Sequence, residues 1–223
     1  MIIAEKAKRG LMLAATSCAL AAIVSGALVT ERVAGLQTAH WLLGTAAVVL
    51  ALPFSTWWLI LPGMALALLP VPVILHALSS PLVLGGTTVF VLPVTGVRSQ
   101  VSAGLRKLIL AAPPLVMVQI LLGAAYRHKA IGVMGHLAGA MTVAGVMVML
   151  CVVLLRQEEL QQRTRRAAGW LIGILITQVT LGMTVLLLRM LDMEAAIPAA
   201  AHVTGGSLTF AASLALVRTT QRS

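Results

Sequence analysis

The sequence predicts an all-α integral membrane protein with eight transmembrane helices, arranged as two pseudo-symmetric four-helix bundles. Sixty per cent of the 223 residues are apolar, and the mean hydropathy is +1.02. Long uncharged stretches match the roughly 20 apolar residues that a helix needs to cross a bilayer. In addition, a Gln-x-x-Leu-Gly motif followed by a histidine occurs twice in the second half, at Gln119 and Gln178. This repetition indicates paired helices rather than one irregular bundle.

The first predicted span covers residues 11–29 and follows the basic residues Lys6, Lys8 and Arg9. Its apolar run is longer than the roughly 7–15 residues of a signal-peptide core, so we interpret it as an uncleaved span. A cleaved leader is the alternative. The other predicted spans are 40–56, 57–75, 77–94, 106–126, 133–155, 168–189 and 200–217.

The region from His40 to Val94 contains no Lys, Arg, Asp or Glu, so no charge marks the ends of its helices. His40 is expected on the outer side and Arg98 on the inner side, so an odd number of spans must join them. A single helix of about 55 residues would be roughly 80 Å long, which is far too long. Three spans of about 18 residues each fit the bilayer. A re-entrant segment in this region is the alternative.

The basic residues predict the orientation of the chain. With the N-terminus inside, twelve of the 16 Lys and Arg residues lie on the inner side, which is the usual positive-inside bias. We therefore expect a protein of the cell (inner) membrane with both termini in the cytoplasm. The net charge of +10 lies in short loops near lipid head groups, so we expect the lipid bilayer and no nucleic acid as a partner. The expected units are an N-terminal half (1–94), an inner linker (95–107) and a C-terminal half (108–223).

Four histidines are the basis of the functional prediction: His40, His76, His136 and His202. In the predicted topology each lies at the outer end of an even-numbered span, so His40 and His76 lie at similar depth, and so do His136 and His202. Imidazoles that face each other across a helical bundle suit axial ligation of a haem iron. Zinc suits the pattern less well, because a structural zinc site needs four nitrogen or sulfur ligands. A structural role, in which each imidazole bonds a carbonyl group, is the alternative.

Other polar residues cluster on the same outer side. Its cations are candidates to pair with haem propionates: Arg32, Arg127, Lys129 and Arg189. His128 lies within a loop, and we interpret it as structural or facing a propionate. Gln119 and Gln178 are interpreted as hydrogen-bonding residues between helices.

The ordered set of motifs resembles the heme A synthase family of cytochrome oxidase assembly proteins, over most of the chain. The segments that carry the resemblance are Gln119–His128 with His136, Gln178–Gly182 with His202, and Leu75-His76-Ala-Leu-Ser-Ser-Pro81. The resemblance implies haem O as a substrate in the N-terminal half and a fixed haem b in the C-terminal half. The implied reaction oxidises a methyl group of haem O to a formyl group. The implied protein partners are haem O synthase and cytochrome oxidase subunits.

The N-terminal half departs from the pattern of this family. Gln37 and Trp41 occupy positions where the family typically has a glutamate and an arginine, and residues 30–39 lack its cysteine pair. A glutamine cannot relay a proton as a carboxylate does, which leaves Glu31 as the candidate acid. The alternative function is therefore a non-catalytic bis-histidine haem b protein for electron transfer or oxidase assembly. A haem-free structural subunit is a third reading.

Overall fold

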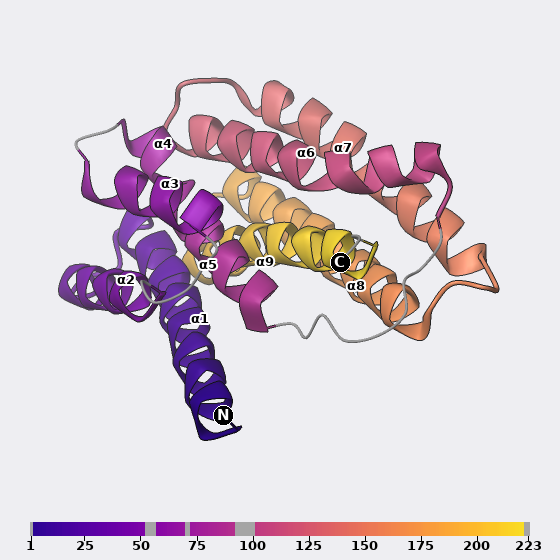
Figure 1. The fold of residues 1–223 in the computed structure, drawn as a ribbon. Helices are drawn as coiled ribbons and strands as arrows, with labels where there is room; N and C mark the ends of the chain where they lie inside the picture. Colours follow the sequence, from indigo (N-terminus) through magenta and orange to yellow (C-terminus); the bar gives the residue numbers. More distant parts are fainter. Residues whose placement is uncertain (1, 52–56, 70–71, 92–100, 221–223) are drawn as a thin grey trace.

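The computed structural model describes residues 2–51, 57–69, 72–91 and 101–220, and in these ranges it contains helices and no strand (Figure 1). The helices are α1 (Ile2–Thr30), α2 (Gln37–Ala51), α3 (Trp57–Leu68), α4 (Val73–His76), α5 (Ser79–Val91), α6 (Ala103–Arg127), α7 (Val133–Arg156), α8 (Gln162–Met190) and α9 (Ala196–Thr220). The all-helical prediction is confirmed.

Among the described residues, five helices are long and apolar enough to cross a membrane. They contain the candidate spans Ala7–Thr30, Ala103–Arg127, Val133–Arg156, Gln162–Met190 and Ala196–Thr220. Large apolar side chains cover their outer faces: Met141, Trp170 and Ile197 are 71%, 72% and 79% exposed. Surfaces with so much exposed apolar area are typical of a membrane environment rather than of water. The chain is therefore a helical membrane protein, as the composition predicts.

Three helices of 12 or more residues lie in the described part of the region between His40 and Val94, where three spans are predicted. The described parts of α2, α3 and α5 have 15, 12 and 13 residues, which gives lengths of about 22, 18 and 20 Å. The described part of each is therefore shorter than the hydrocarbon core of a bilayer, which is about 30 Å thick. Residues 52–56 of the predicted span 40–56, residues 70–71 of the span 57–75, residues 92–94 of the span 77–94 and the linker residues 95–100 lie outside the described residues.

His76 ends a short helix, α4, within two residues of the predicted boundary between spans 57–75 and 77–94. Pro72 forms the N-cap of the four-residue helix α4, because proline lacks the N–H that a longer helix would need there. The turn at Ala77 and Leu78 then separates His76 from α5. The histidine is thus placed at a bend of the chain.

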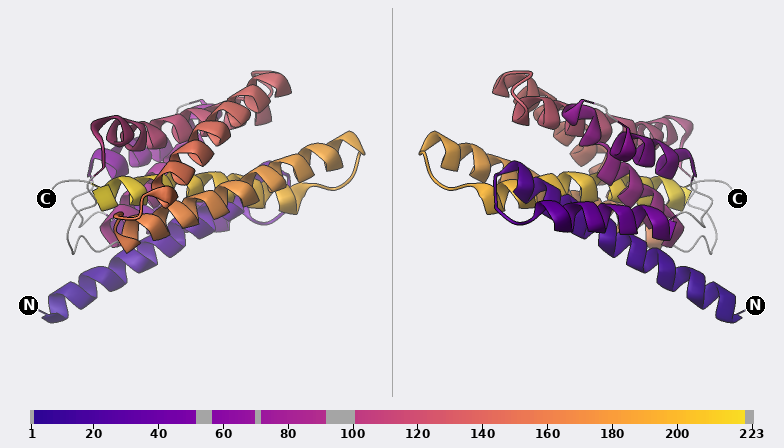
Figure 2. Two further views of the ribbon diagram at one scale, coloured as in Figure 1. Left: turned by 90° about the vertical axis from the view of Figure 1, so that its right-hand side faces the viewer. Right: turned by 90° about the vertical axis from the view of Figure 1, so that its left-hand side faces the viewer.

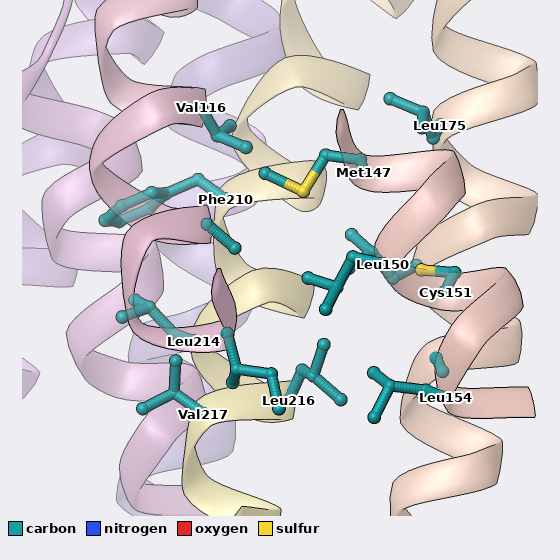
Figure 3. Packing of buried hydrophobic residues seen from close by; sticks show 14 of the residues in the cluster. Val116, Met147, Leu150, Cys151, Leu154, Leu175, Phe210, Leu214, Leu216 and Val217 are labelled. Atoms are coloured by element: carbon teal, nitrogen blue, oxygen red, sulfur yellow. The ribbon is translucent and has the colours of Figure 1, made fainter. Parts of the chain in front are cut away.

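The last four helices pack in a closed ring, since α6 contacts α7, α7 contacts α8, α8 contacts α9, and α9 returns to α6. Their shared core contains fully buried side chains from α7 and α9. Figure 3 shows Met147, Leu150 and Leu154 of α7 on the side of the core opposite Leu216 and Phe210 of α9. This apolar core holds together the helices that carry the second histidine pair.

The first half joins the second through α1 and α5, which both pack on α9, and through α4, which packs on α6. A glycine permits the close approach of α5 to α9. A Cβ atom at Gly85 would lie 2.7 Å from carbon atoms of both Phe210 and Leu214, which is too short for packed carbon atoms.

The ends of the helices separate into two groups (Figure 2). The N-terminal end of α1, the C-terminal end of α9 and the α7–α8 connection lie at one end of the molecule. The connections 31–36, 128–132 and 191–195 lie at the opposite end, which we call the histidine end because all four candidate histidines are near it. The α6–α7 and α8–α9 hairpins diverge toward that end (Figure 2).

Candidate functional site

Three helices, α1, α6 and α8, finish with the same backbone geometry at the histidine end. The second residue beyond each helix has a positive φ, in Arg32 (64°), Lys129 (61°) and Asp192 (54°). The N–H of the next residue bonds a carbonyl five residues back, in the pairs Val33–Leu28, Ala130–Ala125 and Met193–Leu188. This is the Schellman termination, in which a left-handed residue reverses the chain. Each reversal is followed by a helix that carries a histidine near its start: α2, α7 and α9.

Each of these three histidines lies against a glycine of the preceding long helix. A Cβ atom at Gly123 would lie 3.1 Å from Cε1 of His136, and one at Gly182 would lie 2.7 Å from Cε1 of His202. Packed carbon atoms keep about 3.5–4.0 Å, so these positions have no room for a side chain. The glycine of the Gln-x-x-Leu-Gly motif therefore makes space for an imidazole ring.

A third glycine of this kind, Gly26, was not predicted from the sequence. A Cβ atom at Gly26 would lie 2.6 Å from Cε1 of His40, so α1 and α2 repeat the arrangement of the two later hairpins. Ala22 stands four residues before Gly26, where the other hairpins have glutamine. The sequence feature that could have indicated this contact is the glycine itself, which stands near the end of the long apolar helix that precedes the histidine.

The four histidines form two pairs in space. The ring centres of His40 and His76 lie 6.4 Å apart with an interplanar angle of 75°, and those of His136 and His202 lie 6.3 Å apart with an angle of 86°. A metal ion between two imidazole nitrogens, at about 2 Å from each, would place the ring centres about 6 Å apart. Both pairs match this spacing, although their members come from helices that are not consecutive.

In the described part of the chain, no three or more His, Cys, Asp or Glu side chains are placed to share a metal ion. At each candidate site, the possible metal ligands are thus two imidazoles. Two opposed imidazoles suit a metal whose other coordination positions are filled by a macrocycle, as in haem.

Hydrogen bonds at Nδ1 decide which ring nitrogen can bind a metal. Nδ1 of His40, His76 and His202 lies 3.0, 3.1 and 3.0 Å from the main-chain carbonyl oxygens of Ala22, Leu66 and Gln178, respectively. A carbonyl oxygen only accepts hydrogen bonds, so Nδ1 carries the proton in these rings. The neutral rings therefore keep a free lone pair on Nε2, and a fixed ring orientation of this kind is typical of metal-binding histidines.

His136 has a different partner at this nitrogen. Its Nδ1 lies 3.0 Å from Nε2 of the Gln119 side chain, which also donates to the carbonyl oxygen of His136 at 3.1 Å. Gln119 therefore bonds between helices, as predicted from the sequence. The ring of Tyr126 lies nearly parallel to that of His136, with centres 5.9 Å apart and an angle of 7°.

The first pair has an indole beside it. The ring centre of Trp41 lies 6.1 Å from that of His40 and 6.4 Å from that of His76, and the Trp41 side chain is 51% exposed. Gln37 is the first residue of α2 and is exposed. The N-terminal pair is thus bordered by an aromatic side chain and has no acidic residue at position 37.

Two of the predicted propionate-binding cations bond an internal carboxylate. Arg189 donates to both oxygens of Glu31, at 2.9 and 3.1 Å, and Arg127 lies 3.2 Å from Oε1 of the same residue. The Glu31 and Arg127 side chains are only 16% and 15% exposed. This cluster ties α1 to the ends of α6 and α8, and it occupies both carboxylate oxygens of Glu31.

The remaining charged candidates lie in the turns. Lys129 and Arg32 are exposed at the left-handed positions of their turns. Burial and the positive charge of Arg127 lower the pKa of the His128 imidazole, so this ring is neutral at pH 7. A neutral ring is a weak partner for an anion, which favours the structural interpretation of His128.

Comparison of the chain with protein-family models, curated proteins and solved structures gave no match. The arrangement of the two histidine pairs is the feature from which a function can be argued.

Proposed function

We propose that the chain is a two-haem membrane protein of the heme A synthase type. The C-terminal helices hold a haem b through His136 and His202, and the N-terminal helices present haem O, the substrate, to His40 and His76. The observation that carries this proposal is the separation of the ring centres, 6.3 and 6.4 Å, in both pairs. The same spacing, which suits two imidazoles on one metal ion, recurs in both halves of the chain.

At both sites, main-chain carbonyl groups of the protein orient the histidine rings. The carbonyl groups of Ala22, Leu66 and Gln178 hold three of the rings with Nε2 unprotonated. Bound haem would supply one-electron transfer and oxygen chemistry, which protein side chains lack. The arginines of the Glu31 cluster lie at the same end of the helices, where the propionates of a bound haem would need cations.

The proposed topology has eight spans in two four-helix halves, with both termini in the cytoplasm and the histidine end outside the inner membrane. The placement of both termini and the α7–α8 connection at one end of the molecule supports an even number of crossings (Figure 2). In this topology α2, α3 and α4–α5 serve as three short spans. Local thinning of the bilayer would accommodate their limited length.

A second candidate is an electron-transfer or assembly protein that binds haem b without oxidising haem O. Two observations favour it. Gln37 cannot ionise, and Glu31, the other acidic candidate, is held by Arg127 and Arg189. A reaction that moves protons at the N-terminal site would have to use a group other than these two side chains.

Haem content and haem type of the purified protein test both candidates. We expect low-spin bis-histidine haem b in the wild type when it is expressed with a supply of haem O. Haem A, detected by extraction and mass, that disappears in His40→Ala or His76→Ala supports the enzyme. Haem b without haem A in both the wild type and Gln37→Glu supports the electron-transfer protein. Absence of any haem from the wild type would refute both.

A further inference from the structure

The environment of His136 differs from that of the other three histidines. Its Nδ1 contacts an amide nitrogen, Nε2 of Gln119, instead of a carbonyl oxygen. An amide nitrogen only donates hydrogen bonds, so Nδ1 acts as the acceptor here. The proton of the neutral ring then lies on Nε2 of His136. This nitrogen has to be unprotonated in order to bind a metal.

The other end of the same amide group lacks a partner. Oε1 of Gln119 is buried and accepts no hydrogen bond among the described residues. A buried acceptor without a donor is destabilising, particularly in an apolar membrane interior. The absence of a side chain at Gly139 admits this oxygen, since a Cβ atom there would lie only 2.5 Å from it. The terminal torsion of a glutamine is broad and roughly two-fold, and its oxygen and nitrogen are similar in size, so a turned amide group would occupy nearly the same space.

We propose that Gln119 is a positioning residue that controls which nitrogen of His136 can bind iron. In the metal-free protein its amide nitrogen donates to Nδ1, and the ring is held with its proton on Nε2. For Nε2 of His136 to hold haem iron, the ring proton would have to move from Nε2 to Nδ1, with no net exchange of protons. A turned amide would then accept a hydrogen bond from Nδ1–H at Oε1 and would lose the bond from its nitrogen to the His136 carbonyl.

The identity of the metal rests on the proposed function, whereas the role of the amide in the metal-free protein does not. The tautomer of His136 is a property of the chain alone. It can be measured whether or not the protein binds haem, so failure of this inference and failure of the proposed function are distinguishable.

The chain contains a matched control in α8. Gln178 occupies the same motif position as Gln119, its Oε1 is also buried without a partner, and it faces Gly205 as Gln119 faces Gly139. However, His202 bonds the main-chain carbonyl of Gln178 and not its side chain. Gln178→Leu therefore removes an equivalent amide from an equivalent space and leaves the hydrogen bond at the histidine intact.

The first experiment is nitrogen NMR of the metal-free protein with labelled histidine rings. We expect the wild type to show His136 protonated at Nε2 and His202 protonated at Nδ1. Gln119→Leu should shift the His136 ring toward a mixture of tautomers, and Gln178→Leu should leave both rings unchanged. A His136 ring protonated at Nδ1 in the wild type, or the same tautomer in wild type and Gln119→Leu, would overturn the proposal.

The second experiment is a redox titration of the haem-loaded protein. Loss of a hydrogen-bond partner of a metal-binding histidine typically weakens metal binding by about 10–100-fold. A hydrogen bond from Nδ1–H makes the imidazole a better ligand of ferric iron, so its loss should raise the midpoint potential in Gln119→Leu. The potential should rise by about 59 mV for each tenfold decrease in the ratio of the ferric to the ferrous binding affinity. Gln119→Glu keeps an acceptor oxygen and should restore a potential at or below that of the wild type. Equal potentials in Gln119→Leu and Gln178→Leu would contradict the role of the amide.

Discussion

Replacing Gly182 with alanine should disturb the contact between α8 and the imidazole of His202. The added Cβ atom would lie 2.7 Å from Cε1 and 3.2 Å from Nδ1 of that ring. Nonbonded carbon atoms pack at about 3.5–4.0 Å, so the ring has to move by roughly 1 Å. The 3.0 Å hydrogen bond from Nδ1 to the carbonyl of Gln178 would lengthen with that movement.

The expected cost combines three effects. Overpacking of a filled interior typically costs about 1–3 kcal/mol, and the weakened hydrogen bond adds about 1 kcal/mol. Alanine returns up to about 1 kcal/mol because it favours a helix more than glycine does. The free energy of unfolding should therefore fall by about 1–3 kcal/mol, and Tm by about 2–4 °C per kcal/mol for a chain of this size.

Thermal unfolding of the detergent-purified protein, followed by circular dichroism, measures this change. Gly173→Ala is the control, because it lies on the same helix and nothing is within 4 Å of a Cβ atom there. The control should match the wild type or exceed its stability by up to about 1 kcal/mol. If Gly182→Ala unfolds at or above the temperature of Gly173→Ala, the ring has free space at this position and the reasoning is wrong.

Three further predictions concern charge, haem ligation and topology. Glu31→Gln should lower the free energy of unfolding by about 1–3 kcal/mol, because it leaves two arginines without their counter-charge, one of them mostly buried; an unfolding curve identical to that of the wild type would show that the cluster is not stabilising. His136→Ala should abolish the absorption and electron paramagnetic resonance signals of low-spin haem b, whereas His128→Ala should retain them; loss in both or in neither would contradict the assignment. Cysteines placed at the exposed positions Glu159 and Lys129, in a cysteine-free background, should be labelled from opposite sides of the membrane, and labelling from one side would contradict the eight-span proposal.

The five long helices could be predicted from the sequence because hydropathy is a local property. The predicted span 106–126 corresponds to α6 (Ala103–Arg127), and 133–155 corresponds to α7 (Val133–Arg156). The charged residues that end each apolar run also end the helix or follow it closely. The histidines could be selected for the same reason, since each stands near the end of an apolar run.

The predicted spans 40–56, 57–75 and 77–94 overlap α2, α3 and α5, but their exact ends could not be predicted because the region carries no charge and several prolines. In such a segment the boundaries depend on tertiary packing, of α2 and α5 on α1 and of α3 on α5. The turn that places His76 at the end of α4 follows from Pro72 together with the bond from His76 Nδ1 to the Leu66 carbonyl on α3. A sequence pattern does not show which carbonyl a ring nitrogen meets.

The sequence by itself determined the membrane-embedded helices and the four histidines, because both depend on residue type and on spacing within a few turns. Only the tertiary structure decided how these residues meet. It joins Glu31 to Arg189 across 158 residues, and it gives His136 an amide partner where His202, in an equivalent motif, has a carbonyl. These differences depend on the relative position of two helix surfaces to within about 1 Å, and identical short motifs do not encode that distance.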